Sequence, residues 1–211
     1  MCLYSDGRWK DAEELDIQVL EREKMLGQEH PDTLTGMANL VLTYWNQGRR
    51  KEAEELDVQV LKMSLRVLGE EHPDTLSSMA NLVSTYWDQG RWKEAEELEV
   101  QVLEKRKRVL GQEHPGTLTS MNNLASTYQY QGRWKEAEEL EVQVLETRTR
   151  VLGQEHPDTL TSIANLASTY RYQGRWKEAE ELQVQVLKVK KRVLGQEHPD
   201  TLISMNNLAF T

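Results

Sequence analysis

The ten-residue stretch QGRWKEAEEL occupies residues 89–98 and is repeated at residues 131–140 and 173–182. Close variants, DGRWKDAEEL and QGRRKEAEEL, occupy residues 6–15 and 47–56. A second marker, the dipeptide His-Pro, recurs every 42 residues and begins at His30, His72, His114, His156 and His198. A fixed period of this length is typical of a repeat array such as a solenoid. Copies this similar cannot fill different places in one compact core, so we expect them to stack on one another.

One copy, residues 72–113, predicts two helices. Its first half carries apolar residues at steps of three and four, which is the pattern of one amphipathic helix: Leu76, Met79, Leu82, Val83 and Tyr86. Pro73 suits the first turn of this helix, and Gly90 suits its left-handed C-terminal end. A second stripe follows the glycine at Trp92, Ala95, Leu98, Val102 and Val109. The first helix of a copy is called helix A below and the second is called helix B.

The predicted fold is all-α, a right-handed α-solenoid of stacked antiparallel helix pairs. We expect a single array over residues 1–211, with full copies at 30–71, 72–113, 114–155 and 156–197. Residues 1–29 then form an incomplete copy that is mainly helix B, and residues 198–211 form a lone helix A. Neither end carries the polar cap that repeat arrays normally need, so head-to-tail self-association is a further expectation.

Composition bounds the function. The net charge of −9 argues against a nucleic-acid partner, because phosphate binding needs clustered basic residues. No apolar run is long enough to span a membrane, and the N-terminus carries no secretory signal pattern. The single cysteine, Cys2, cannot form an internal disulfide and fits a reducing, cytoplasmic location.

The sequence predicts no enzyme, no cofactor and no metal site. The five histidines occur once per copy, so neighbouring ones should lie too far apart to share an ion; we expect each to close the loop at a helix start. Catalysis needs unlike groups that converge in one pocket, whereas Ser, His and Glu recur here at equivalent, separate positions.

Leu82, Tyr86, Gly90, Trp92 and Ala95 fall at the spacing of the tetratricopeptide repeat, whose usual period is about 34 residues. The 42-residue period resembles the longer, kinesin-light-chain-like subtype. The repeat sequence is most similar to the C-terminal repeats of fungal NLR-type (NB-ARC) receptors. This resemblance covers essentially the whole chain and implies a superhelix that binds a protein or peptide through its concave groove, as the recognition or scaffolding arm of such a receptor. A structural, self-associating array and a kinesin-light-chain-like cargo adaptor are the alternatives.

The resemblance also places the binding residues on helix A. An asparagine occurs once in every copy, and it either hydrogen-bonds a bound peptide or caps a neighbouring helix or loop: Asn39, Asn81, Asn123, Asn165 and Asn207. Aromatic residues near the end of helix A either anchor a partner or pack on the next copy: Trp45, Trp87, Tyr130 and Tyr172. Variable or polar positions complete the predicted groove: Ser84, Asn122, Ser126, Ser168 and Arg171.

Three further expectations concern helix B. The acidic residues of its first turns, Glu94, Glu96 and Glu97, are either a binding patch or a solvated face that suits the helix dipole. Arg50 replaces the tryptophan of the other copies and should weaken the junction there. The polar residues in mid helix B, where the related repeats often have an aromatic residue, are expected to reach solvent: Asp57, Glu99, Glu141 and Gln183.

Overall fold

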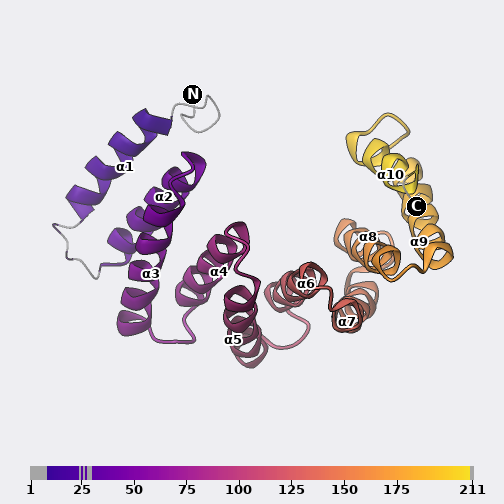
Figure 1. The fold of residues 1–211 in the computed structure, drawn as a ribbon, viewed down its shortest axis with the longest axis horizontal. Helices are drawn as coiled ribbons and strands as arrows, with labels where there is room; N and C mark the ends of the chain where they lie inside the picture. The colour runs from indigo at the N-terminus through magenta and orange to yellow at the C-terminus, as the bar shows by residue number, and fades with distance from the viewer. Residues whose placement is uncertain (1–8, 24, 26, 28–29, 210–211) are drawn as a thin grey trace. The chain divides into compact units, whose positions relative to one another are not determined.

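The computed structural model describes residues 9–23, 25, 27 and 30–209; Cys2 lies outside this range. Every regular element in this part of the chain is a helix (Figure 1). The helices are α1 (Trp9–Glu23), α2 (Pro31–Asn46), α3 (Arg50–Val67), α4 (Pro73–Asp88), α5 (Trp92–Leu110), α6 (Pro115–Tyr130), α7 (Trp134–Leu152), α8 (Pro157–Tyr172), α9 (Trp176–Val193) and α10 (Pro199–Ala209). The even-numbered helices are helix A of a copy, and the odd-numbered helices are helix B.

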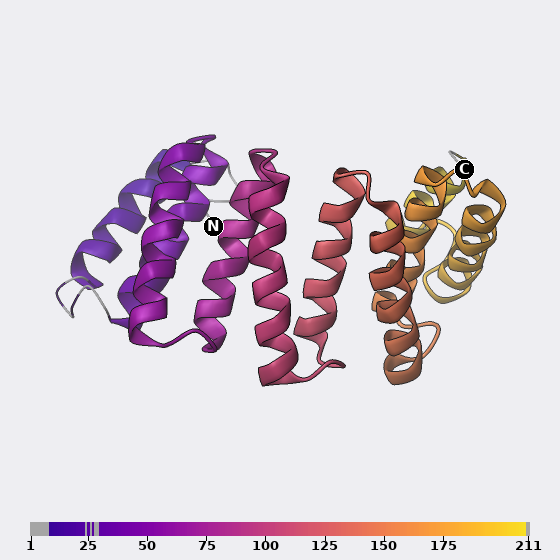
Figure 2. The ribbon, with the colours of Figure 1, turned by 60° about the horizontal axis from the view of Figure 1, so that its bottom comes forward.

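The chain divides into two compact units, residues 1–109 and 110–211. In the first unit α1 packs on α2, α2 on α3 and α3 on α4, and α4 packs on α5 through Leu76, Met79 and Val102. In the second unit each of the helices α6 to α10 packs on the next one. Within each unit neighbouring helices run antiparallel (Figures 1 and 2). The predicted all-α fold of stacked helix pairs is therefore confirmed.

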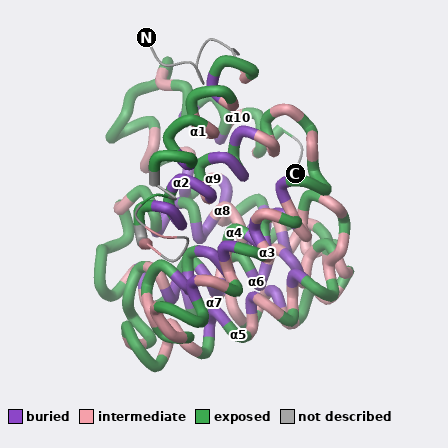
Figure 3. Tube along the Cα trace, turned by 90° about the vertical axis from the view of Figure 1, so that its left-hand side faces the viewer, coloured by how far each residue is buried: buried purple, intermediate pink, exposed green. Residues whose placement is uncertain are grey.

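Each helix buries one side, so buried and exposed residues alternate along the trace (Figure 3). In the first unit Leu20, Met37, Leu40 and Val60 join α1, α2 and α3 in one apolar cluster. The alanine of the repeated stretch is fully buried in four copies, at Ala53, Ala95, Ala137 and Ala179. The small side chain at this position lets two helices approach closely, as its place in the sequence predicts.

The helix ends follow the sequence signals. The Nδ1 atom of His72 accepts a hydrogen bond from the backbone N–H of Asp74 at 3.2 Å, and so caps the start of α4. Equivalent caps begin α2, α6 and α8, so the predicted role of these histidines at the helix start is confirmed. Gly90 ends the turn after α4 with φ of 71°, a conformation that other residues rarely adopt.

The repeated Gln, Arg and Glu side chains join successive copies. In the first unit the Nη1 atom of Arg91 lies 2.6 Å from an oxygen of Glu54, and Gln89 donates to the other oxygen of Glu54 at 2.8 Å. The Arg91 guanidinium also stacks 4.3 Å from the ring centre of Tyr86 and pairs with Glu94. Burial alone would raise the pKa of Glu54, but the hydrogen bonds from Arg91 and Gln89 hold it below its usual value.

The same contact set recurs in the second unit, where Arg175 and Gln173 bind Glu138. This set of contacts is called the arginine staple below. The acidic start of helix B is therefore neither a patch reserved for a ligand nor only a solvated face, because some of its glutamates hold the next copy.

The polar residues in mid helix B do not reach solvent, so that expectation is wrong. Asp57 is 3% exposed and Glu141 is 2% exposed; Glu99 and Gln183 are buried as well. The hydroxyl of Thr85, from the following helix A, donates to Asp57 at 2.7 Å, and that of Thr169 donates to Glu141 at 2.6 Å. At these two positions a buried hydrogen bond between two copies takes the place of the aromatic residue that related repeats often carry.

Candidate peptide-binding surface

The helices α2, α4, α6 and α8 each carry one row of exposed or half-buried side chains, at intervals of four, three and four residues. Such spacing places the members of a row on one face of the helix. The rows are called the helix A stripes. In the first unit they comprise Thr35, Asn39, Leu42 and Asn46 on α2, and Ser77, Asn81, Ser84 and Asp88 on α4. In the second unit they comprise Thr119, Asn123, Ser126 and Tyr130 on α6, and Thr161, Asn165, Ser168 and Tyr172 on α8. The predicted asparagines therefore share one stripe position in every copy.

The asparagines keep their amides available. Asn39, Asn81 and Asn123 are exposed and Asn165 is half-buried, and none of these four side chains forms a hydrogen bond with the described part of the chain. Asn207 on α10 is exposed too. An amide can donate two hydrogen bonds and accept two. For those four residues, no hydrogen bond to the described part of the chain supports the alternative role of capping a helix or loop.

Two of the predicted groove serines, Ser84 and Ser126, are already bonded within their own helices. Ser84 donates to the carbonyl oxygen of Ala80 at 3.1 Å, and Ser126 donates to that of Asn122 at 3.1 Å. Asn122 is different, because its Oδ1 atom is buried and has no hydrogen-bond partner within residues 9–209 that the structure describes. It marks a point of the second unit where an acceptor is unused.

The aromatic residues divide between packing and exposure. Tyr172 stacks on Trp134 of the preceding copy, with ring centres 6.4 Å apart, yet it remains 54% exposed. Trp87 is half-buried and meets Trp92 edge-on at 5.0 Å. Tyr130 is 59% exposed. Packing between copies therefore accounts for part of the Tyr172 surface and leaves the rest open to a partner.

The two remaining predicted residues, Trp45 and Arg171, are half-buried at the ends of α2 and α8. Arg50, which replaces a tryptophan, lies 5.4 Å from the ring centre of Trp45 and forms an ion pair with Asp88 of the next copy. Position 50 thus has a contact with position 88, just as position 134 has one with position 172.

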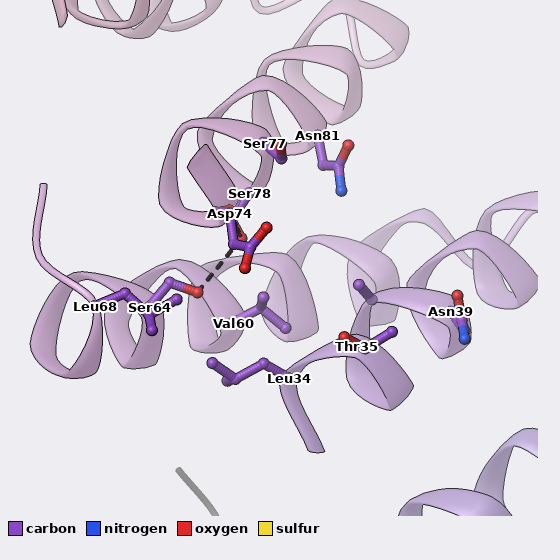
Figure 4. Close-up of a pocket in the computed structure, with 11 residues that line it drawn as sticks. Leu34, Thr35, Asn39, Val60, Ser64, Leu68, Asp74, Ser77, Ser78 and Asn81 are labelled. Atoms are coloured by element: carbon purple, nitrogen blue, oxygen red, sulfur yellow. Dashed lines mark hydrogen bonds between the residues drawn. The ribbon is translucent and has the colours of Figure 1, made fainter. Parts of the chain in front are cut away.

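A cavity of about 160 Å³ opens beside Asn39 and Asn81, between α2, α3 and α4 (Figure 4). Its apolar side is formed by Leu34, Val60 and Leu68, and its polar side includes Ser64 and Ser78. The sequence interpretation missed this site. A signal was nevertheless present, because Ser64 takes the place of a basic residue in each of the three following copies.

The described residues contain neither a cluster of metal-binding side chains nor a membrane-spanning helix. Over this part of the chain, no three His, Cys, Asp or Glu side chains gather as a metal site would require. Likewise, none of the described helices has the length and apolar character of a membrane span.

Comparison with known proteins places these features in a family context. A family model described as tetratricopeptide repeat matches residues 2–32, 33–74, 75–116, 117–158 and 159–200. The chain is similar to two crystal structures of nearly identical TPR-like repeats of a putative kinesin light chain from Podosopora anserina. One has a TM-score of 0.83 at 35% identity over 91% of each chain, and the other has a TM-score of 0.81 at 36% identity over 90% of each chain.

A more distant structure, BtubC (BKLC) from P. vanneervenii, has a TM-score of 0.80 at 20% identity. It covers 96% of this chain and 82% of its own, and it supports the fold alone. Among curated proteins, none matches the chain.

Proposed function

Because the chain belongs to the tetratricopeptide-repeat family, a family of protein-interaction repeats, we propose that it binds an extended peptide segment of a partner protein along the helix A stripes. The observation that carries the proposal is the stripe asparagine. It is identical in all five copies, it lies at an exposed or half-exposed position, and in four copies the described part of the chain makes no use of its amide.

An asparagine in mid helix costs helix propensity relative to alanine. The fold gains nothing visible in return from Asn39, Asn81, Asn123 or Asn165. A peptide in extended conformation presents alternating N–H and C=O groups that such an amide can bind at both ends. The repeated asparagines therefore suit recognition of a peptide main chain, with variable stripe residues such as Leu42 and Ser84 in the first unit reading its side chains.

Two cellular roles use the same surface. The similarity of the repeat sequence to the C-terminal repeats of fungal NLR-type receptors supports a recognition or scaffolding arm of such a receptor. The likeness to repeats of a putative kinesin light chain supports a cargo adaptor. The nature of the selected peptides distinguishes these roles, while the binding chemistry proposed here is common to both.

The test begins with selection of peptides from a displayed random library on the wild-type chain. Their affinities are then measured by isothermal titration calorimetry with the double variant Asn39→Ala/Asn81→Ala, whose two positions lie in the first unit. Loss of two amide hydrogen bonds at about 1 kcal/mol each weakens binding by about 30-fold. Because both side chains are exposed, the melting temperature should change little.

A matched control is available in helix B of the same unit, where Gln59 and Gln101 are exposed polar residues at equivalent positions of two copies. The double variant Gln59→Ala/Gln101→Ala should bind the selected peptides like the wild type. Equal affinity of the asparagine variant and the wild type, or failure of the library to yield any binding peptide, would contradict the proposal. Concentration-dependent light scattering in that last case would favour the self-associating array instead.

A further inference from the structure

The cavity between α2, α3 and α4 is lined by Ser64, which occupies a position where the copies differ. Position 64 in α3 aligns with positions 106, 148 and 190 at steps of 42 residues. These positions carry Ser64, Arg106, Arg148 and Lys190, so the copy at residues 30–71 has a small neutral side chain where the three copies that follow have a cation.

Arg148 shows what a cation does at this position. It is only 8% exposed, and its Nη1 atom donates to the backbone carbonyl of Asp158 at 3.0 Å and to the hydroxyl of Ser162 at 2.9 Å. Lys190 likewise reaches the backbone carbonyl of Asp200, at 3.4 Å. The first turn of the following helix A therefore provides an acceptor pair that a buried cation from helix B occupies.

The same acceptors are present in the first unit without the cation. Asp74 and Ser78 are the counterparts of Asp158 and Ser162. The Ser78 hydroxyl donates to the Asp74 carbonyl at 2.9 Å, as Ser162 does to Asp158 at 3.1 Å, so the Ser78 oxygen can still accept hydrogen bonds. Ser64 itself is 1% exposed, and the contact of its hydroxyl is a long one to Ser78 at 3.4 Å (Figure 4).

We propose that this cavity binds the guanidinium group of an arginine side chain that belongs to the bound peptide. The site deepens, and rests on, the peptide-binding function proposed above, because Asn39 and Asn81 of the stripes lie at its edge. The ligand side chain would supply the donor that Arg148 supplies internally in its own copy.

Size and charge both fit this ligand. A cavity of about 150 Å³ admits benzene, and the planar guanidinium group is smaller than a benzene ring, so about 160 Å³ is sufficient. The carboxylate of Asp74 stands at the exposed edge, and the methylene stem of an arginine can lie along Leu34, Val60 and Leu68. The rigid fork of guanidinium donors matches several separate acceptors better than the single ammonium of lysine.

The first experiment probes the cavity without any peptide. N-acetyl-L-arginine methylamide is titrated into the ¹⁵N-labelled chain, and the amide signals of Ser64, Ser77 and Ser78 are followed by NMR. We expect saturable shifts at these residues and at least a tenfold weaker response with N-acetyl-L-citrulline methylamide, which has the same shape without the charge.

The variant Ser64→Arg should remove the response, because it restores the side chain that the other copies carry and fills the cavity. The reverse variant, Arg148→Ser, should open a second site whose shifts appear at Ser162. No shifts in the wild type, equal shifts with the citrulline probe, or an undiminished response in Ser64→Arg would each overturn the proposal. A control variant, Gln59→Ala, changes an exposed residue on α3 and should respond like the wild type.

The second experiment separates this proposal from the general function. Peptides selected on the wild-type chain are resynthesised with each arginine replaced by citrulline. The replacement should lower affinity at least tenfold for the wild type and leave affinity for Ser64→Arg unchanged. If the asparagines are needed but citrulline changes nothing, the arginine site is wrong and the peptide-binding function stands. If the arginine probe binds and no peptide does, the cavity chemistry stands and the peptide-binding function fails.

Discussion

Replacing the buried Glu141 by glutamine should stabilise the protein at alkaline pH and have little effect at acid pH. Burial raises the pKa of Glu141 to about 7, although the hydrogen bonds from Thr169 and Gln129 oppose the shift. The unfolded chain titrates near the ordinary value of 4.5. The folded state thus holds this proton more tightly, and the stabilisation is complete below pH 4.5 and is lost as the pH rises through 7.

The size of the effect follows from the shift. A difference of about 2.5 pKa units at 1.36 kcal/mol per unit corresponds to about 3 kcal/mol between about pH 4 and about pH 9. Glu141 is only 2% exposed, so solvent screening reduces this little. Glutamine keeps the shape of the protonated acid and an oxygen that can accept from Thr169. A glutamine, Gln183, occupies the same position in the next copy and is buried there.

The assay is urea unfolding, followed by circular dichroism, of the wild type and Glu141→Gln at several pH values. The difference in unfolding free energy should be near zero at the acid end and rise toward about 3 kcal/mol in favour of the variant at the alkaline end. Glu139→Gln, at an exposed position of the same helix, makes the same change in net charge and should not reproduce this trend. Parallel pH dependence of the wild type and Glu141→Gln would refute the reasoning.

Three other predictions concern the contacts between copies, each measured by urea unfolding. Arg91→Ala should lower the free energy of unfolding by about 2–3 kcal/mol, because Arg91 contacts partners in two copies. Arg108→Ala, which removes an exposed ion pair, should lower it by at most about 0.5 kcal/mol. Similar losses for the two variants would argue against a stabilising role of the arginine staple. Arg50→Trp combined with Asp88→Tyr should recreate the stack of Trp134 on Tyr172 and show favourable coupling of about 1 kcal/mol in a double-mutant cycle, and strictly additive effects would contradict this. His72→Ala should cost about 1 kcal/mol through loss of the helix cap, and an unchanged midpoint would mean that the cap contributes nothing.

Local structure could be predicted from the sequence because its causes are local. The 42-residue period, the glycine after each helix A and the His-Pro pair at each helix start all act within a few residues of where they stand. The positive φ of Gly90 and the cap formed by His72 confirm these predictions. The burial of the alanine in the repeated stretch could also be predicted, since a small residue among larger ones indicates close helix packing.

Contacts between copies were harder to predict, because their partners lie far apart in sequence. Asp57 meets Thr85 across 28 residues, and Glu54 meets Arg91 across 37 residues. Taken alone, an acid in mid helix B suggests solvent, since burying a lone carboxylate is costly. Only the packing of one copy on the next reveals that a threonine hydroxyl faces it. The acidic residues at the start of helix B likewise indicate a solvated face when taken alone. Their contacts with arginines of the following copy, such as that of Glu54 with Arg91, appear only in the packed structure.

Some substitutions between copies are matched by a change in the residue that they contact, whereas others are not. The residues at positions 50 and 88 change together and stay in contact. Arg50 forms an ion pair with Asp88, whereas at the equivalent positions of later copies Trp134 stacks on Tyr172. Such paired changes keep the interface between copies satisfied and require no ligand.

Position 64 varies alone. Serine replaces the cation there. The residue types that bind Arg148 in a later copy, Asp158 and Ser162, are nevertheless retained at the equivalent positions as Asp74 and Ser78. If the substitution served packing alone, an apolar side chain would fill the space and avoid leaving a buried hydroxyl with one long contact. The acceptors are retained, the internal donor is gone, and the space opens beside two stripe asparagines, which is the combination expected where a donor arrives from outside the chain.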